Sequence, residues 1–539
     1  MVFTSITQIE IYFSSLLERL HIAPENLEGI NHGLKPTHIA TAAALAVGTL
    51  IYRTFSYPQK LSHISHVPAW QWFWSVIRGE TNLDRTKKFM LPRLHESGGL
   101  VSHWGQFGWE VVLINPELAK AILRKPDVYP KSTSISDLHP ETLVHRFLGH
   151  SNLVLANGED WKRRRRIANP AFHRSMPVKA FSQLTANVFQ QIDKSEGAPI
   201  DVGPLLQSFT LDAIGLVGFG FDFNAILTPD NEWVHTYNYV ANNLLEFPFI
   251  FFPILDTHLR FLFPKRQDKH KALTKLNDLF DLIIKNKREA IEKKALNKEE
   301  NEKDLLTLLI ESGRGEDDAN EPLDDEELRS ELVLFFFAGH DTTANALAST
   351  LYFLATHKEV QAKARKEAED VLGDEPRDSW PSVNELKEMT YITCVLKEAA
   401  RLANPASGII EREVTEDTNL GGYIVPKGSL LNIDILGVHH NPDYWSDPET
   451  FNPDRFKEGG EMDSQTSAAA YLPFGAGTRQ CIAGMNFSIA EQRVALSGIL
   501  RKYEVSLPEN SEHKDGLKFS NHLFLLQPKN LKIIFKRRY

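Results

Sequence analysis

The chain has 539 residues, of which 42% are hydrophobic and 10% aromatic, enough to bury a large core. A formal net charge of -10, a pI near 6.1 and the lack of any array of interleaved basic and aromatic residues argue against nucleic-acid binding. The two cysteines provide no disulfide framework, which is typical of a reducing, cytosolic setting.

The first sixty residues predict a membrane-associated segment (1–60) ahead of a catalytic domain (61–539). An apolar stretch from Ile39 to Tyr52 is about 21 Å long as a helix, shorter than a hydrocarbon core of about 30 Å. Extension to 37–55 restores the length, so we predict one transmembrane helix there. A buried helix or an interfacial helix is the alternative.

A basic run follows at 161–166, with the sequence Trp-Lys-Arg-Arg-Arg-Arg. On a helix, Trp161 and Arg165 share one face at i, i+4, while Lys162, Arg163 and Arg166 point elsewhere. Such a run usually forms a solvated face; a docking surface for an acidic partner is the alternative.

Two aromatic segments, 247–253 and 261–264, are more apolar than surface loops usually are. They are equally compatible with core packing and with a roof over a pocket that dips into a membrane.

The segment from Lys293 to Asn320 is charged, and we expect it to be an exposed connection that leads into a long helix. Asp324 and Glu327 form a capping-box pattern at the start of this helix, and the helical pattern continues to about His357, a length on the order of 50 Å. The apolar stretch 332–354 predicts that the helix is buried on all sides.

The middle of that helix contains Ala338-Gly339-His340-Asp341-Thr342-Thr343. Gly339 costs roughly 1 kcal/mol relative to alanine, which suggests that another group approaches the backbone closely. Taken alone, Thr342 could simply bond to the preceding turn and Asp341 could simply face water.

Charged residues and short strands fill the next part of the chain. Glu398 and Arg401 lie on one helical face at i, i+3, and Arg455 follows in Phe-Asn-Pro-Asp-Arg-Phe. Strands are expected near 111–114 and over 423–435, where Pro-Lys-Gly forms a turn.

The loop 474–484 carries the strongest chemical signal. Its glycines allow the backbone to fold around Cys481, Arg479 can pair with an anionic group of a cofactor, and Phe474 can shield the sulfur. One thiolate without neighbouring cysteines or histidines does not fit zinc or an iron–sulfur cluster, whereas haem needs only one such ligand. An ordinary buried cysteine is the alternative, and this is the role expected of Cys394.

Phe474, Gly477, Arg479 and Cys481 resemble the haem-ligand signature of the cytochrome P450 superfamily, and the three upstream motifs follow in that family's order. The resemblance is to eukaryotic, microsomal, fungal-like members. It implies a mainly α fold with a large helical domain, a small β-rich subdomain and an N-terminal membrane anchor. The chain departs from the family's signature at Ala483, which stands before Gly484 as if one residue had been inserted between the cysteine and that glycine.

The resemblance also implies roles for individual residues. Cys481 would be the axial ligand of haem b, Thr342 and Asp341 would deliver protons, and Glu398, Arg401 and Arg455 would form a buried structural triad. The haem contacts would be Trp161, Arg165, Arg412, Phe474 and Arg479. The substrate pocket would include Phe336, Phe337, Ala338, Ile409 and Ile410.

The implied activity is insertion of one atom of O2 into a hydrophobic molecule: a steroid, a fatty acid or a xenobiotic. Because too little chain follows Cys481 for a flavin domain, we expect electrons from NADPH-cytochrome reductase, with cytochrome b5 as a second donor. The expected location is the endoplasmic reticulum membrane, with the catalytic domain in the cytosol. The alternatives are a reductase-independent peroxide isomerase or peroxygenase, and a haem-thiolate sensor or carrier without turnover.

Overall fold

The computed structural model describes residues 45, 48–49, 52–173, 176–228, 231–293, 303–312, 322–522 and 525–539. Most of the predicted span 37–55 lies outside these residues; its described part is helical. The described residues contain one helical stretch that is long and apolar enough to cross a membrane, Val202–Phe219, but 61% of it is buried, as in a core helix.

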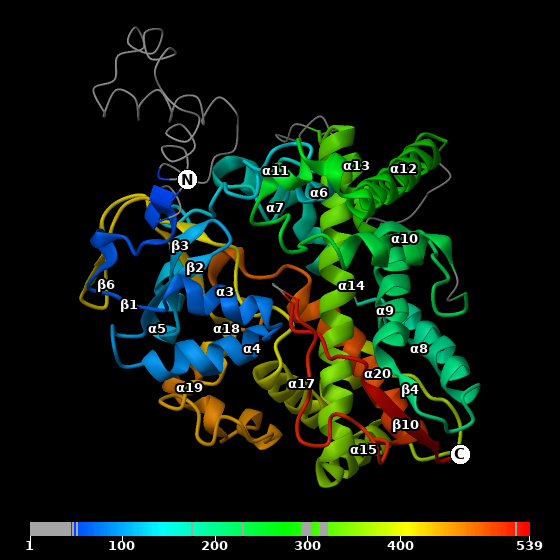
Figure 1. The fold of residues 1–539 in the computed structure, drawn as a ribbon. Coiled ribbons are helices and arrows are strands. Elements are labelled where there is room, and N and C mark those ends of the chain that lie inside the picture. Colours follow the sequence, from blue (N-terminus) through cyan, green and yellow to red (C-terminus); the bar gives the residue numbers. More distant parts are fainter. Residues whose placement is uncertain are drawn as a thin grey trace, which may run out of the picture.

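The fold is mainly helical, with the long helix α14 (Asp325–Thr356) running through its centre (Figure 1). The other long helices are α7 (Gly158–His173), α8 (Val178–Asp193), α9 (Val202–Ala213), α10 (Glu232–Ala241), α12 (Pro264–Glu292), α15 (Lys358–Leu372), α17 (Thr390–Leu402) and α20 (Ile489–Lys502). Short helices are α3 (Ala69–Ile77), α4 (Asn82–Arg85), α5 (Pro116–Leu123), α6 (Leu143–Leu148), α11 (Pro253–Asp256), α13 (Leu305–Glu311), α16 (Val383–Glu388), α18 (Ile435–His439) and α19 (Gln465–Ala469).

Helix α14 begins and ends where the sequence predicts. The Asp324 carboxylate accepts a hydrogen bond from the Glu327 N–H (2.8 Å), and the Glu327 carboxylate accepts one from the Asp324 N–H (3.2 Å). Gly339 does not line the cavity described below. A Cβ at Gly339 would stand 3.3 Å from Ile214 of the π-helix η6 (Ile214–Phe219), so the glycine allows another helix to approach.

The prediction of an exposed connection at 293–320 is wrong where the structure describes it. Leu305, Leu306, Leu309 and Ile310 of α13 are buried against neighbouring helices. Their apolar run outweighs the charged residues around it.

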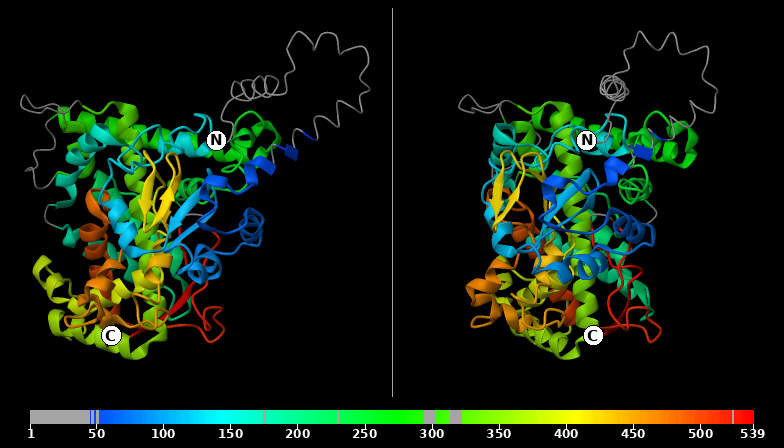
Figure 2. Two further views of the ribbon diagram at one scale, coloured as in Figure 1. Left: turned by 90° about the vertical axis from the view of Figure 1, so that its left-hand side faces the viewer. Right: turned by 60° about the vertical axis from the view of Figure 1, so that its left-hand side comes forward.

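The β-rich part lies beside the helices (Figure 2). Its main sheet has the strand order β1-β2-β3-β8-β5 and is mixed: β1 pairs with β2 and β3 with β8 in parallel, while β2–β3 and β8–β5 are antiparallel. Its strands are β1 (Ser65–His66), β2 (Leu100–Gly105), β3 (Gly108–Leu113), β8 (Leu430–Ile433) and β5 (Arg412–Glu413). The smaller sheets join β4 (Ile200–Asp201), β10 (Lys532–Arg537) and β9 (Tyr503–Ser506), and β6 (Thr418–Leu420) with β7 (Tyr423–Val425). Strands β3, β7 and β8 confirm the strands expected from the sequence.

Candidate active site

The Cys481 loop folds so that its backbone surrounds the sulfur. The Cys481 N–H donates to the Phe474 carbonyl (3.0 Å), and the Gly484 N–H donates to Cys481 Sγ (3.3 Å). Gly477 has φ +72°, and a Cβ there would lie 2.4 Å from the Leu123 carbonyl oxygen. Only glycine therefore fits this turn without distortion.

The extra residue after the cysteine is absorbed by a π-helix, η12 (Gly484–Ser488), which precedes α20. A π-turn takes up one residue more than an α-turn, which matches one extra residue at this point of the chain. Gly484 is required here because a Cβ would lie 2.2 Å from Phe474 Cδ1 and 3.1 Å from Cys481 Sγ.

Cys481 is exposed, although its crowded loop raises the pKa of its thiol by desolvation. Backbone N–H groups of Gly484 and Ala483 and the cations Arg165 and Lys131 act in the opposite direction. A metal cation bound at the sulfur would complete the stabilisation of the thiolate.

Four cations converge beside this loop: Arg165, Arg412, Arg479 and Lys131. Burial, Arg412 and Arg165 lower the pKa of Arg479 to about 9, and burial lowers that of Arg412 to about 10. Burial and the three arginines also lower the pKa of Lys131. Lys131 belongs to no recognised motif, so the sequence did not predict it as a residue of this site.

This cluster fits the propionate groups of haem. Arg479 Nε and Nη1 and Arg412 Nε are buried without a hydrogen-bond partner, and none of the four cations forms an ion pair with a described carboxylate. The Arg479 guanidinium lies over the Trp161 ring, 4.1 Å from its centroid, and Arg165 Nη1 donates to the Gln480 carbonyl (2.9 Å). Guanidinium groups that are buried without a hydrogen-bond or ion-pair partner require an anion, and carboxylates match their geometry.

A cavity of about 820 Å³ extends from α14 to the main sheet. Phe337, Ala338, Asp341 and Thr342 of α14 line it together with Ile409 and Ile410.

Phe336 is a correction to the predicted pocket. Its side chain is 1% exposed and packs against Tyr237 and Phe280, with ring centroids 4.7 Å and 5.4 Å away, outside the cavity lining. Phe336 lies on the side of α14 that faces these two rings, whereas Phe337, about 100° further around the helix, reaches the cavity.

The family model described as Cytochrome P450 matches residues 66–535. The chain belongs to the cytochrome P450 family. It is 31% identical to human cytochrome P450 4F8 over 430 residues, covering 77% of this chain and 79% of the relative. It is 30% identical to rat cytochrome P450 4F3, covering 86% and 88%, and 29% identical to mouse cytochrome P450 3A11, covering 79% and 82%.

This P450 is accordingly a haem-thiolate monooxygenase with haem b as its cofactor. Of its two cysteines, Cys394 is buried in α17 and Cys481 is exposed in the loop described above.

Asp341 and Thr342 of the P450 lie in different environments. Thr342 Oγ1 donates back to the Ala338 carbonyl (2.7 Å) and borders the cavity. Asp341 Oδ1 accepts from Gln207 Nε2 (3.0 Å) and lies 3.2 Å from His340 Nδ1. Burial acts to raise the pKa of Asp341, but His340, Gln207 and His522 outweigh it, so the pKa is lowered and the carboxylate is ionised.

The far end of the cavity is polar, which sequence reasoning missed. Glu110 Oε1 lies 3.2 Å from His103 Nε2, and Asn432 Nδ2 donates to Glu110 Oε2 (3.3 Å). Burial and the nearby Glu411 raise the pKa of Glu110 to about 8, while burial lowers that of His103 to about 3. Both side chains are therefore neutral at pH 7.

The structure brings Glu398, Arg401 and Arg455 together. Arg401 Nε and Nη2 bind both Glu398 oxygens at 2.7 and 2.8 Å, and Arg455 Nε lies 3.4 Å from Oε1. The Asn452 N–H donates to the same oxygen (3.0 Å).

The basic run on α7 is less exposed than its sequence indicates. Arg163 pairs with Asp160 and Glu327, and Arg164 Nη1 binds Glu331 at 2.8 Å, so these arginines fasten α7 to α14. The expectation that Arg163 adds to an exposed positive patch is therefore wrong; Lys162 and Arg166 are the exposed basic residues of the run.

Proposed function

We propose that this P450 oxygenates a neutral, mainly apolar molecule that carries one polar group, with steroids ahead of fatty acids and xenobiotics. The observation that carries the proposal is the division of the cavity. On α14 it is lined by Phe337 and Ala338 beside Thr342 and Asp341 of the proposed proton relay, and on the main sheet it is lined by Glu110 and His103.

The polar end suits a hydroxyl or carbonyl better than a carboxylate. Arg85 is the cation of the lining there, and it already donates to the Glu80 carbonyl and to Asn82 Oδ1. Burial and Glu411 already disfavour a negative charge on Glu110, and they would disfavour the charge of a bound carboxylate in the same way.

The proposed haem site joins the Cys481 loop and the cation cluster. Cys481 would bind the haem iron and Phe474 would shield its sulfur. The propionates would be held by Trp161, Arg165, Arg412 and Arg479. Bound haem supplies the iron at which dioxygen is activated. Thr342 would position a proton-donating water, and the ionised Asp341 would relay protons to it.

The expected electron donor is NADPH-cytochrome reductase, with cytochrome b5 as a second donor. Lys162 and Arg166 on α7 would offer positive charge to an acidic donor surface.

A membrane location on the cytosolic side of the endoplasmic reticulum is supported by apolar side chains near the predicted span. Phe55 packs against Phe73 (5.4 Å between ring centroids), which packs against Phe251 (5.8 Å) of the 247–253 segment. Large apolar side chains are exposed on this segment, its neighbours and α3: Trp70, Trp74, Ile77, Phe252, Ile254, Phe261 and Leu262.

The substrate is tested by spectral titration of haem-loaded protein with steroids, fatty acids and neutral xenobiotics, followed by turnover with NADPH-cytochrome reductase. We expect the tightest binding from molecules with one neutral polar group opposite the oxidised carbon. Preferential binding of free carboxylates would contradict the proposal.

A pH dependence follows from Glu110. Below pH 8 its neutral carboxyl donates a hydrogen bond to a ligand carbonyl; above pH 8 it is a buried anion, so ligand affinity falls by about threefold to tenfold. Glu110→Gln removes this decline because its amide donates at every pH. An identical decline in the variant would assign it to Glu411, which lines the same cavity and whose pKa burial also raises.

Thr342→Ala is expected to keep haem binding but lower the product formed per NADPH by at least about tenfold. The matched control is Thr350→Ala on the same helix, whose hydroxyl donates to the Ala346 carbonyl (2.8 Å) outside the cavity lining. Unchanged coupling in Thr342→Ala would remove its proposed role.

Turnover assays with and without NADPH-cytochrome reductase distinguish two other candidate functions. A peroxide isomerase or peroxygenase would turn over without reductase, and a sensor or carrier would form no product. The Asp341–Thr342 pair at the cavity supports oxygen activation instead.

A further inference from the structure

A second pocket, which we call the α6–α12 pocket, lies outside the oxidation cavity. It has a volume of about 450 Å³ and opens to solvent. It is formed by α6, the segment around the 3-10 helix η7 (Arg260–Leu262) and the first turns of α12. Its lining consists of Arg146, Thr257, His258, Arg260, Phe261, Gln267, His270, Lys271 and Thr274.

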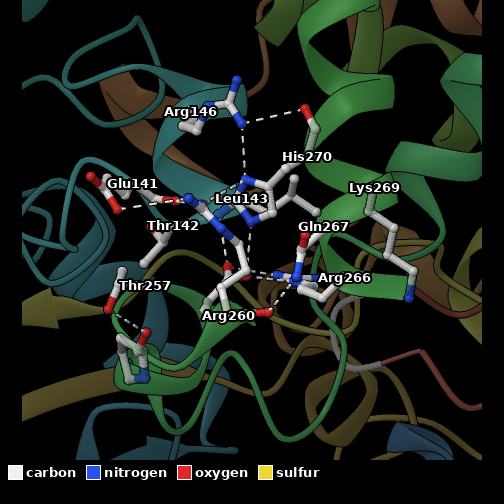
Figure 3. A network of polar contacts seen from close by, with 12 residues as sticks. Glu141, Thr142, Leu143, Arg146, Thr257, Arg260, Arg266, Gln267, Lys269 and His270 are labelled. Carbon is white, nitrogen blue, oxygen red and sulfur yellow. Dashed lines mark hydrogen bonds and ion pairs between the residues drawn. The ribbon is translucent and has the colours of Figure 1, made fainter. Parts of the chain in front are cut away.

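Positive charge gathers in this pocket without an acidic residue in its described lining. Arg146 Nη1 lies 2.9 Å and Arg260 Nη1 3.4 Å from the same atom, His270 Nδ1 (Figure 3). Arg146 also donates to Thr274 Oγ1 (2.9 Å) and the His270 carbonyl (3.3 Å). These acceptors are neutral, so none of these hydrogen bonds supplies Arg146 with a counter-charge.

The nearest carboxylates are already engaged. Asp256, behind the pocket, accepts two hydrogen bonds from Arg266 (2.6 and 2.8 Å) and one from the Leu143 N–H (2.8 Å). Asp256 also lies 2.9 Å from His270 Nε2, which leaves Nδ1 as an acceptor toward the arginines. Asp268 pairs with Lys271 (3.0 Å), and Glu141 lies 3.9 Å from Arg260.

The two arginines therefore face the pocket as a preformed anion site. Burial and Arg260 lower the pKa of Arg146, and Asp256 and Glu141 offset this effect only in part. Two guanidinium groups match the oxygens of a phosphate group.

The surroundings of the pocket identify the source of that phosphate. Phe261 of the lining is 68% exposed, and Leu262 and Ile254 beside it are 59% and 46% exposed. Exposed apolar side chains next to a cationic pocket fit a bilayer surface, where acyl chains and phosphate groups lie side by side.

We propose that the α6–α12 pocket binds the phosphate group of an anionic phospholipid. The contact would hold the 247–262 segment, which includes the cavity-lining Phe247 and Phe251, at a fixed depth in the bilayer surface.

The test measures sedimentation of the haem-loaded full chain with phosphatidylcholine vesicles that contain none or one fifth phosphatidic acid. Phosphatidic acid should strengthen binding of the wild type, and Arg146→Gln/Arg260→Gln should weaken that binding by about tenfold or more. The matched control is Lys265→Gln/Lys275→Gln, which removes two charges from α12 outside the pocket lining and should change binding by less than about threefold. Equal losses in the two variants would overturn the proposal.

A second measurement compares, for the wild type and for the arginine variant, how anions change each protein's own unfolding temperature. Inorganic phosphate should raise the unfolding temperature more than chloride at equal ionic strength, and the arginine variant should lose this difference. No difference in the wild type overturns the site. A phosphate effect without selectivity for phosphatidic acid overturns the lipid assignment in favour of a soluble phosphate compound.

Discussion

Cys481→Ser is expected to abolish the large red shift of the Soret band that carbon monoxide should cause in the reduced wild-type protein. A serine hydroxyl is far too weakly acidic to replace a thiolate on iron, and neither Gly484 N–H nor Arg165 can compensate for the lost charge. Product formation should be lost with the shift. The measurement is the reduced carbon-monoxide difference spectrum, scaled to total haem.

Cys394→Ser is the matched control because it makes the same atomic change at the other cysteine. Cys394 is 6% exposed within α17, and burial raises the pKa of its thiol. This variant should retain the shift. If the shift persisted in Cys481→Ser or disappeared in Cys394→Ser, the ligand assignment would be wrong.

The sequence could predict those parts of the site whose residues all belong to one short motif. The Cys481 loop and the capping box of α14 depend on neighbours within a few residues, and local geometry then follows from residue type. The mainly α fold with a small β-rich part also followed, since the motifs together identified the family.

The parts that sequence could not predict arise from contacts between distant segments. Lys131 joins Arg412 and Arg479, and Glu110 meets Asn432, only because strands and loops far apart in the chain converge. Arg163 was expected on an exposed patch because the sequence does not show that Glu327, which lies on another helix, pairs with it. The sequence also could not show which way each side chain points. Phe336 packs into the protein core and not toward the cavity.

Glu398→Ala is expected to destabilise the protein by about 3–5 kcal/mol and to lower the fraction that retains haem. Glu398 and Arg401 are 0% exposed and Arg455 is 4% exposed, so the variant leaves two guanidinium groups buried without their shared carboxylate. Urea unfolding and the ratio of haem to protein measure the two effects. The control is Glu159→Ala, which breaks an exposed i, i+3 pair with Lys162 and should leave the urea midpoint and the haem ratio nearly unchanged.

The haem loss is expected because hydrogen bonds connect this triad to the cysteine loop. Arg401 Nη1 donates to the His439 carbonyl (2.9 Å), and His439 Nε2 accepts from the Leu472 N–H (2.9 Å), two residues before Phe474. Burial lowers the pKa of His439 to about 3, so the ring stays neutral and its Nε2 remains an acceptor. When Arg401 loses Glu398 it no longer holds His439 in place, and the loop that presents Cys481 loses its support. A variant that unfolds more easily but keeps full haem occupancy would show that the triad stabilises the fold without positioning the loop.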